Sequence, residues 1–219
     1  MTFSEHMREE LFNGASRYGI TLTDDSLSLF ENYYHLLLQG NDRMNIVSKR
    51  DMTRFVPYHL LDSLKVASCF DMSSVIRMLD FGSGGGLPGI PLSCVFPHIE
   101  TFLVDSRKKK CLFLDDVITS LSIDAHVLCS RIEQLPDSYN DFFDLIITRA
   151  TVKLVPFYKC SQRLIHRGGS LISIKGDTIQ DEFSRLQTAY DPKVFNIQLT
   201  VPEDVPSVRR GYIVVITRF

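Results

Sequence analysis

The sequence has no long apolar run and no N-terminal leader pattern. A membrane-spanning helix needs roughly 18 uninterrupted apolar residues, and the 219 residues contain no such run. The chain starts with Met1-Thr-Phe-Ser-Glu-His6, which lacks the basic and then apolar order of a signal peptide. These absences predict a cytoplasmic protein that has no membrane partner.

Paired cysteines and an excess of basic charge are also missing. No two of the five cysteines stand in Cys-x-x-Cys spacing (Cys69, Cys94, Cys111, Cys129 and Cys160). We therefore expect reduced, mostly buried thiols and no metal site. The formal net charge is −2, so any contact with nucleic acid requires a local basic face.

The chain does contain enough apolar material for one core, since 44% of its residues are hydrophobic. Residues 1–72 are predicted to form a helical extension, and residues 73–219 a catalytic domain. Within the extension, Thr23 suits a helix cap, apolar residues follow it at helical spacing, and Gly40 is expected to end the helix. We expect the protein to be a monomer.

From about residue 75, short apolar and β-branched runs alternate with helical segments, which is typical of parallel strands joined by crossover helices. The expected strands are 75–81, 99–105, 125–129, 143–148 and 170–175, followed by 194–201 and 212–217. The last two are separated by a stretch too short for a helix, so they predict an antiparallel hairpin. An α/β, Rossmann-like, mostly parallel seven-stranded sheet ending in such a hairpin is typical of class I methyltransferases, whereas a dinucleotide dehydrogenase would continue with a second mononucleotide-binding half.

A glycine-rich loop leaves the first of these strands and opens a helix. In Leu79-Asp-Phe-Gly-Ser-Gly-Gly-Gly-Leu-Pro-Gly89 the glycines allow a sharp turn and a close approach of the backbone to a ligand, and the proline suits a first helical turn. The dehydrogenase fingerprint needs a small residue where Leu87 stands. Gly82, Gly84 and Gly86 instead follow the G-x-G-x-G spacing of methyltransferases, so S-adenosylmethionine is the expected cofactor.

Two aspartates lie at the ends of neighbouring strands. Asp105 ends the second strand, where a carboxylate can accept hydrogen bonds from both ribose hydroxyls of an adenosine. The alternative is that Asp105 caps the following helix. Asp80, one strand earlier, can either orient the ammonium group of the cofactor or brace the loop.

The fourth strand ends in Ile147-Thr-Arg-Ala150. It lacks the Asn or Asp, two prolines and aromatic that adenine-amino methyltransferases carry there, and no cysteine has the setting of a cytosine-C5 nucleophile. Guanine N7 carries an unprotonated lone pair, so its methylation needs orientation and no general base. Arg149 can hold the cofactor or the O6 atom of the base, or it can pair with a nearby carboxylate.

Several motifs together resemble those of the ribosomal small-subunit methyltransferase G family, also called the glucose-inhibited division protein B family. They lie at residues 45–51, 59–63, 82–91, 103–106, 148–150 and 174–176, and the resemblance covers nearly the whole chain. The resemblance implies guanine-N7 methylation of 16S ribosomal RNA in the small subunit, with S-adenosylmethionine as methyl donor. Carried over position by position, the cofactor contacts fall on Gly82, Leu87, Asp105, Ile132, Glu133 and Arg149.

Two of these positions need comment. Glu133 either meets the adenine edge of the cofactor or is an ordinary surface glutamate. Family members usually have an aromatic residue where this chain has Thr151, so a ring that would stack on the base or the cofactor is missing.

Basic residues that are candidates for RNA contact form four groups: Arg43, Lys49, Arg50 and Arg54; Arg107 to Lys110; Arg163, His166 and Arg167; and Arg209 with Arg210. The first, second and last groups predict a phosphate-binding surface if they share the edge formed by the strand C-termini. Lys175 ends the fifth strand, either at the substrate or as a surface lysine. His59 and Asp62 are three residues apart, which favours a shared hydrogen bond that fixes the N-terminal helices to the catalytic domain. The alternative is a catalytic role for this pair.

Three other functions share some of these features. A class I methyltransferase that acts on another RNA would have the same cofactor loop. A nicotinamide-dependent oxidoreductase would share the loop and Asp105, but Leu87 and the terminal hairpin disfavour it. A catalytically inactive RNA-binding relative would lose the glycine loop, which is intact here.

Overall fold

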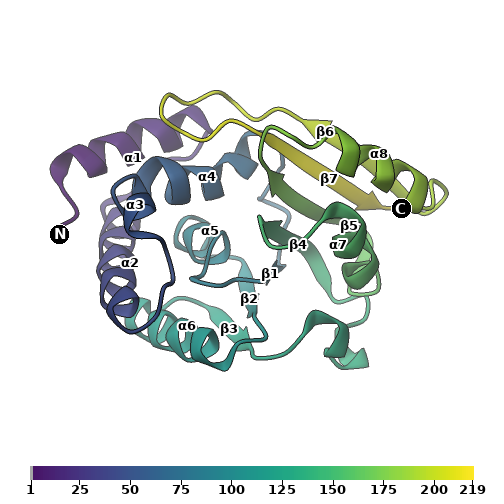
Figure 1. Ribbon diagram of the computed structural model, residues 1–219, viewed down its shortest axis with the longest axis horizontal. Coiled ribbons are helices and arrows are strands. Elements are labelled where there is room, and N and C mark those ends of the chain that lie inside the picture. Colours follow the sequence, from purple (N-terminus) through teal and green to yellow (C-terminus); the bar gives the residue numbers. More distant parts are fainter. Residues whose placement is uncertain (1) are drawn as a thin grey trace.

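A seven-stranded sheet forms the centre of the computed structural model, which describes residues 2–219 apart from the side chain of Lys49. The strands are β1 Arg77–Phe81, β2 Glu100–Val104, β3 Ala125–Leu128, β4 Phe143–Arg149, β5 Ile165–Lys175, β6 Phe195–Thr200 and β7 Tyr212–Arg218. Their order is β3-β2-β1-β4-β5-β7-β6 (Figure 1). The pairs among β1 to β5 are parallel, and β7 is antiparallel to both β5 and β6. The predicted class I methyltransferase fold with its terminal hairpin is therefore confirmed.

Helices cover both faces of this sheet (Figure 1). The α-helices are α1 Glu5–Arg17, α2 Asp24–Arg43, α3 Lys49–Met52, α4 Leu61–Leu64, α5 Gly89–Val95, α6 Lys108–Leu121, α7 Leu154–Ser161 and α8 Gln180–Ala189. A π-helical turn, η1 (Val56–Leu60), precedes α4, and three 3₁₀ turns follow it along the chain: η2 (Lys65–Ser68), η3 (Ile132–Gln134) and η4 (Asp137–Tyr139). Among residues 2–219, no helix is both long and apolar enough to cross a membrane.

Alternating strand residues divide the core into two layers, as the period of two requires. In β4, Leu145 and Ile147 join a cluster with the N-terminal helices, α5 and α6. Ile146 between them points to the other face and packs in a cluster with α7 and α8. Both faces are thus buried, which is why these strands are nearly continuous apolar runs.

Helix α2 begins as predicted and ends later than predicted. The Thr23 hydroxyl accepts from the Ser26 amide, and Ser26 reciprocates in a capping box. Gly40, however, does not end the helix, which continues to Arg43. A Cβ at Gly40 would lie 2.6 Å from Ile46 and 2.7 Å from Phe113, so close packing explains this glycine and overrides its low helix propensity.

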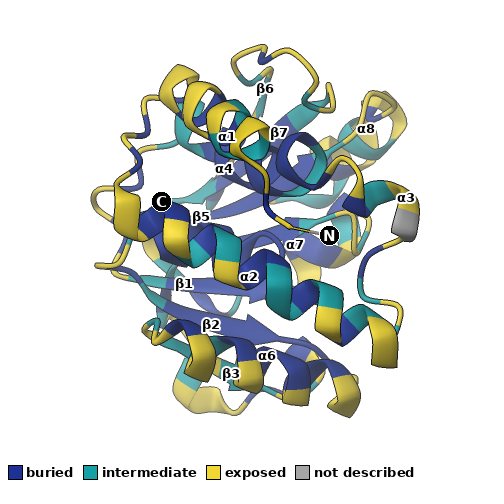
Figure 2. Cartoon of the chain, turned by 90° about the vertical axis from the view of Figure 1, so that its left-hand side faces the viewer, coloured by how far each residue is buried: buried dark blue, intermediate teal, exposed yellow. Residues whose placement is uncertain are grey.

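The N-terminal helices rest directly on the glycine-rich loop. Figure 2 shows α2 running across the strands with its buried side turned inward. From α2, the fully buried Tyr33 donates a 2.7 Å hydrogen bond to the carbonyl of Gly85. Ile46 packs so closely that a Cβ on Gly85 would lie 2.4 Å from it. Residues of the N-terminal extension therefore help to fix the conformation of the glycine-rich loop at Gly85.

Candidate active site

A cleft of about 560 Å³ opens where the parallel strands end. The loops after β1, β2, β3 and β4 form it, with Phe81, Gly82, Val104 to Arg107, Ser130 to Glu133, and Ala150 to Val152 as the lining. Four residues singled out from the sequence meet there: Gly82, Asp105, Ile132 and Glu133. The carboxyl edge of an open α/β sheet is the usual place for a ligand.

The glycine loop adopts backbone conformations that favour glycine. Gly82 has φ +75° and Gly84 has φ +59°, in the left-handed region. A Cβ on Gly82 would lie 2.3 Å from the Thr151 methyl carbon, whereas one on Gly84 would find no heavy atom closer than 3.8 Å. Gly84, Gly86 and Leu87 are not part of the cleft lining, and Gly86 and Leu87 are buried. The loop therefore offers free space at Gly84.

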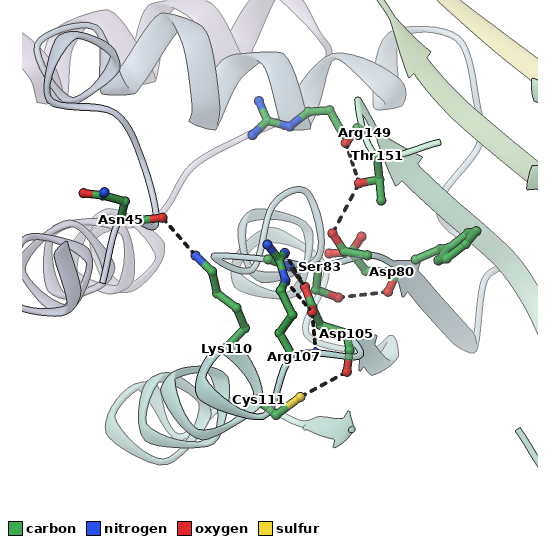
Figure 3. Close-up of polar contacts among 12 residues, drawn as sticks. Asn45, Asp80, Ser83, Asp105, Arg107, Lys110, Cys111, Arg149 and Thr151 are labelled. Atoms are coloured by element: carbon green, nitrogen blue, oxygen red, sulfur yellow. Dashed lines mark hydrogen bonds and ion pairs between the residues drawn. The ribbon is translucent and has the colours of Figure 1, made fainter. Parts of the chain in front are cut away.

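The carboxylate of Asp105 accepts four hydrogen bonds (Figure 3). Gly84 donates its amide at 3.1 Å, and Arg107 donates its amide at 2.9 Å and two guanidinium N–H groups at 3.0 and 2.9 Å. Burial alone raises the pKa of Asp105, but these bonds outweigh it and bring that pKa below its ordinary value. The carboxylate thus accepts from the amide of Arg107, the N-cap residue of α6, and faces the cleft; α6 itself has no side-chain cap. The Arg107 side chain, 64% exposed, covers it.

Asp80 braces the loop from below. Its carboxylate accepts from the Gly89 amide at 3.0 Å, and its carbonyl accepts from the Ser83 hydroxyl at 2.9 Å (Figure 3). The side chain is fully buried, and burial raises the pKa of Asp80 to about 7. Of the two roles expected for Asp80, this geometry shows the bracing role.

Residues after β3 and β4 close the far side of the cleft. Ile132 is buried, while Glu133 is exposed and accepts from the Cys160 thiol at 3.2 Å. Thr151, in the position of the missing aromatic, donates to the carbonyls of Gly82 and Arg149 (Figure 3). This hydroxyl ties the loop after β4 to the glycine loop.

Arg149 points away from this cleft and into a second cavity. It donates to the Tyr58 carbonyl at 3.0 Å, to the Asp62 carboxylate at 3.0 Å and to Nδ1 of His59 at 3.1 Å. The pairing with a carboxylate is therefore the alternative that the structure shows. Burial and the nearby Arg149 lower the pKa of His59 to about 4, so its ring is neutral at pH 7.

The prediction that His59 and Asp62 share a hydrogen bond with each other is wrong. Both side chains contact Arg149 instead, and Asp62 also accepts from the buried Lys65 at 2.6 Å. The spacing of three residues brings the two side chains to one face. The guanidinium group of Arg149, at the end of β4, then donates hydrogen bonds both to Nδ1 of His59 and to the carboxylate of Asp62. The helices are thus fixed to the sheet through Arg149.

The second cavity, of about 200 Å³, joins segments far apart in the sequence. Its lining is Asp51, Tyr58, His59, Asp62, Arg149, Ala150, Ile174 to Gly176, and Arg209. Lys175 is paired here, donating to the Val152 carbonyl at 2.7 Å and to Glu182 at 2.9 Å. Sequence reasoning did not single out Tyr58 or Arg209 for this site. The only signal for Asp51 was its place at the end of the 45–51 motif.

The basic groups divide between the two edges of the sheet. Arg54 and Arg209 lie 5.1 and 5.2 Å from the Tyr58 ring centre, so the first and last groups meet. Arg43 and Lys109 line one shared hollow, which brings the first and second groups together. Lys110 is buried and donates to the Asn45 carbonyl (Figure 3), so it is not part of the basic face. Lys49 belongs to the first group, but its side chain is outside the described residues.

The remaining sequence expectations have clear outcomes. Arg163, His166 and Arg167 lie at the start of β5, the opposite edge of the sheet, where His166 contacts Asp144 at 2.6 Å. The five cysteines are all unpaired, as expected. Only Cys94 and Cys111 are fully buried, however, so the expectation of mostly buried thiols is wrong.

Comparison with known proteins identifies the family. A family model described as rRNA small subunit methyltransferase G matches residues 26–205. The chain is 34% identical over 184 residues to the ribosomal RNA small subunit methyltransferase G of Thermoanaerobacter sp. strain X514, covering 83% of this chain and 77% of that one. It is 32% identical over 200 residues, 91% of each chain, to the protein of that name from Chromobacterium violaceum.

A solved structure supports the fold alone. The match in the fibrillarin/Nop5p complex has a TM-score of 0.55 at 16% identity and covers 73% of this chain and 80% of that chain. The sheet order, the glycine-rich cleft and the family match agree with one another. The chain therefore belongs to the rRNA small subunit methyltransferase G family.

Proposed function

We propose that this protein transfers the methyl group of S-adenosyl-L-methionine to N7 of a guanine in 16S ribosomal RNA. The observation that carries the proposal is the pair of cavities that share Ala150 at the carboxyl edge of the sheet, one built on the glycine loop and one next to it. Family membership supports the same reaction class.

The cleft fits the proposed cofactor. Its volume of about 560 Å³ lies within the range of roughly 300–1,000 Å³ usual for small-molecule sites. Asp105 would accept the ribose hydroxyls, with Ile132 and Glu133 beside the adenine and Gly82 and Gly84 beside the amino-acid portion. Gly86 and Leu87 would act from behind, by holding the shape of the loop. When bound, S-adenosyl-L-methionine supplies an electrophilic methyl group.

The residues of the second cavity would orient the acceptor base. Guanine N7 needs no proton removed before it attacks, so the protein has only to hold it in line with the methyl group. Arg149 and Lys175 are the positioning residues that we propose. Both are held in fixed geometry by hydrogen bonds to their neighbours, which favours orientation over proton transfer.

The substrate partner that we propose is 16S RNA or the small ribosomal subunit, in the cytoplasm, bound by a monomer. Arg43, Arg54, Lys109 and Arg209 are exposed. Arg209 lines the second cavity, Arg54 contacts its Tyr58, and Arg43 and Lys109 line a separate hollow, an arrangement that suits phosphate contacts that weaken with salt. We also propose that residues 1–72 act as an extension of a catalytic domain formed by residues 73–219.

The test is methyl transfer from labelled S-adenosyl-L-methionine to small ribosomal subunits and to the RNA extracted from them. The product nucleoside is then identified and mapped. We expect a single N7-methylguanine in 16S RNA. Transfer to a different nucleoside, or no transfer by protein that demonstrably binds the cofactor, would contradict the proposal.

A further inference from the structure

The second cavity has the position that an acceptor site requires. Methyl transfer needs donor and acceptor in contact, with the nucleophile in line with the sulfur–methyl bond. Ala150 lines both this cavity and the cleft. The hydrogen bond from Thr151 to Gly82 keeps the loop after β4 against the glycine loop. The two cavities are therefore neighbours at Ala150.

The size and walls of this cavity suit a single planar base. Its volume of about 200 Å³ is below the usual range of roughly 300–1,000 Å³ for larger ligands. Tyr58 and Arg209 are part of the wall, with the Arg209 guanidinium 5.2 Å from the centre of the Tyr58 ring, and Arg54 donates a hydrogen bond to the Tyr58 hydroxyl at 2.7 Å. Aromatic and guanidinium planes are the surfaces on which proteins stack unpaired RNA bases.

Asp51 is a carboxylate of the lining whose hydrogen-bonding chemistry differs toward guanine and adenine. The other carboxylate of the lining, Asp62, is already bonded to Lys65 and Arg149. Within residues 2–219, no described side chain or amide donates a hydrogen bond to the carboxylate of Asp51. An ionised carboxylate accepts only. Guanine offers adjacent N1–H and N2–H donors, whereas adenine offers an acceptor at N1.

We propose that the second cavity receives the acceptor guanine and that Asp51 selects it by accepting hydrogen bonds from N1–H and N2–H. N7 lies on the opposite side of the base from N1 and N2. A guanine held by Asp51, on α3, therefore turns N7 away from the N-terminal helices. This inference deepens the proposed function and depends on it.

Replacing guanine by inosine at the methylated position tests the contact, because inosine lacks only the 2-amino group. Wild-type protein and Asp51→Asn are compared on small subunits reconstituted with either RNA. For wild-type protein we expect kcat/KM to fall about 10- to 100-fold from guanine to inosine, the loss typical of a hydrogen bond to a charged group. For Asp51→Asn, we expect kcat/KM to be low already on the guanine RNA and to fall little further on the inosine RNA.

Two further variants separate selection from folding. Asp51→Glu keeps the carboxylate and should recover part of the preference for guanine. Asp42→Asn removes an exposed negative charge from the neighbouring end of α2 and lines neither cavity, so its preference should equal that of wild-type protein. Affinity for S-adenosyl-L-methionine, measured by calorimetry, should be unchanged in all three.

The outcomes are distinct. If Asp51→Asn keeps the wild-type ratio of guanine to inosine rates, Asp51 does not read the base and the inference is wrong. If wild-type protein shows no preference for guanine over inosine, the inference is equally wrong. Failure of the proposed function would look different, since wild-type protein would then bind the cofactor and methylate neither RNA.

Discussion

The two cavities at the edge of the sheet are built in different ways. The cleft is made by four consecutive strand-end loops between residues 81 and 152. Hydrogen bonds between the side chains of Asp105, Asp80 and Thr151 and backbone amides and carbonyls hold the glycine loop in place. The second cavity joins residues 51–62, 149–150, 174–176 and 209. Its walls are held by a buried ion-pair cluster around Asp62. The cleft is therefore a local feature of the fold, and the second cavity depends on packing between distant segments.

The largest expected effect is a loss of folding stability when the ion-pair cluster of the second cavity is broken. Asp62→Ala removes the shared partner of Lys65 and Arg149, all three of them largely buried. Leaving buried cations without their carboxylate typically costs about 3–5 kcal/mol. We expect the free energy of unfolding in urea to fall by that order, whereas cofactor affinity of the folded protein stays near wild type. A loss below about 1 kcal/mol would mean that this cluster behaves like a surface ion pair.

The converse change alters the glycine loop next to the cleft, at the residue whose amide donates to Asp105. Gly84→Val introduces a side chain into the free space beside Asp105 and should weaken binding of S-adenosyl-L-methionine at least about 100-fold, because the branched side chain fills room needed by the ligand. Calorimetry measures this. Gly168→Val is the matched control, since Gly168 also has positive φ (+85°) and has no heavy atom within 4 Å of an added Cβ. If cofactor affinity falls equally in both variants, the loss comes from backbone strain and not from a side chain that occupies the ligand's space.

The pH dependence of stability tests the buried support of the glycine loop beside the cleft. Burial raises the pKa of Asp80 to about 7, above its ordinary 3.8. The folded protein therefore holds this proton more tightly than the unfolded chain does. This favourable contribution is complete below about pH 4 and is lost as pH rises through 7.

Urea unfolding between pH 5 and 8 tests this linkage. Asp80 should add a downward slope of at most ~1.4 kcal/mol per pH unit to the wild-type free energy of unfolding. Asp80→Asn should lack that slope, since an amide does not titrate and its oxygen can still accept from the Gly89 amide. Parallel profiles for the two proteins would show that Asp80 is ionised throughout this range.

The smallest effect concerns the entrance of the cleft. Arg107→Leu frees both oxygens of Asp105 from the guanidinium group. An exposed ion pair contributes only ~0–1 kcal/mol, so cofactor affinity should rise by no more than about fivefold, and less at high salt. Lys108→Leu removes an exposed cation from the same helix and serves as control. Weaker binding by Arg107→Leu than by Lys108→Leu would show that Arg107 helps to hold the cofactor.

Local sequence patterns predicted the fold correctly where no tertiary contact opposed the local preference. The Thr23 cap, the five parallel strands and the hairpin of β6 and β7 follow from capping chemistry and hydrophobic period. Gly40 shows where such a signal fails. Its sequence context resembles a helix end, but contacts with Ile46 and Phe113 across the structure keep the helix intact.

The candidate site divides in the same way. Order along the chain was enough to bring Gly82, Asp105, Ile132 and Glu133 into one cleft, because parallel strands joined by right-handed crossovers put their carboxyl ends at one edge. The sequence left the roles of Arg149, Lys175 and Asp80 open. Only the tertiary structure showed the hydrogen-bond partners of these residues and brought Asp51 and Tyr58 together with Arg209, because a side chain's partner depends on which distant segments pack against it.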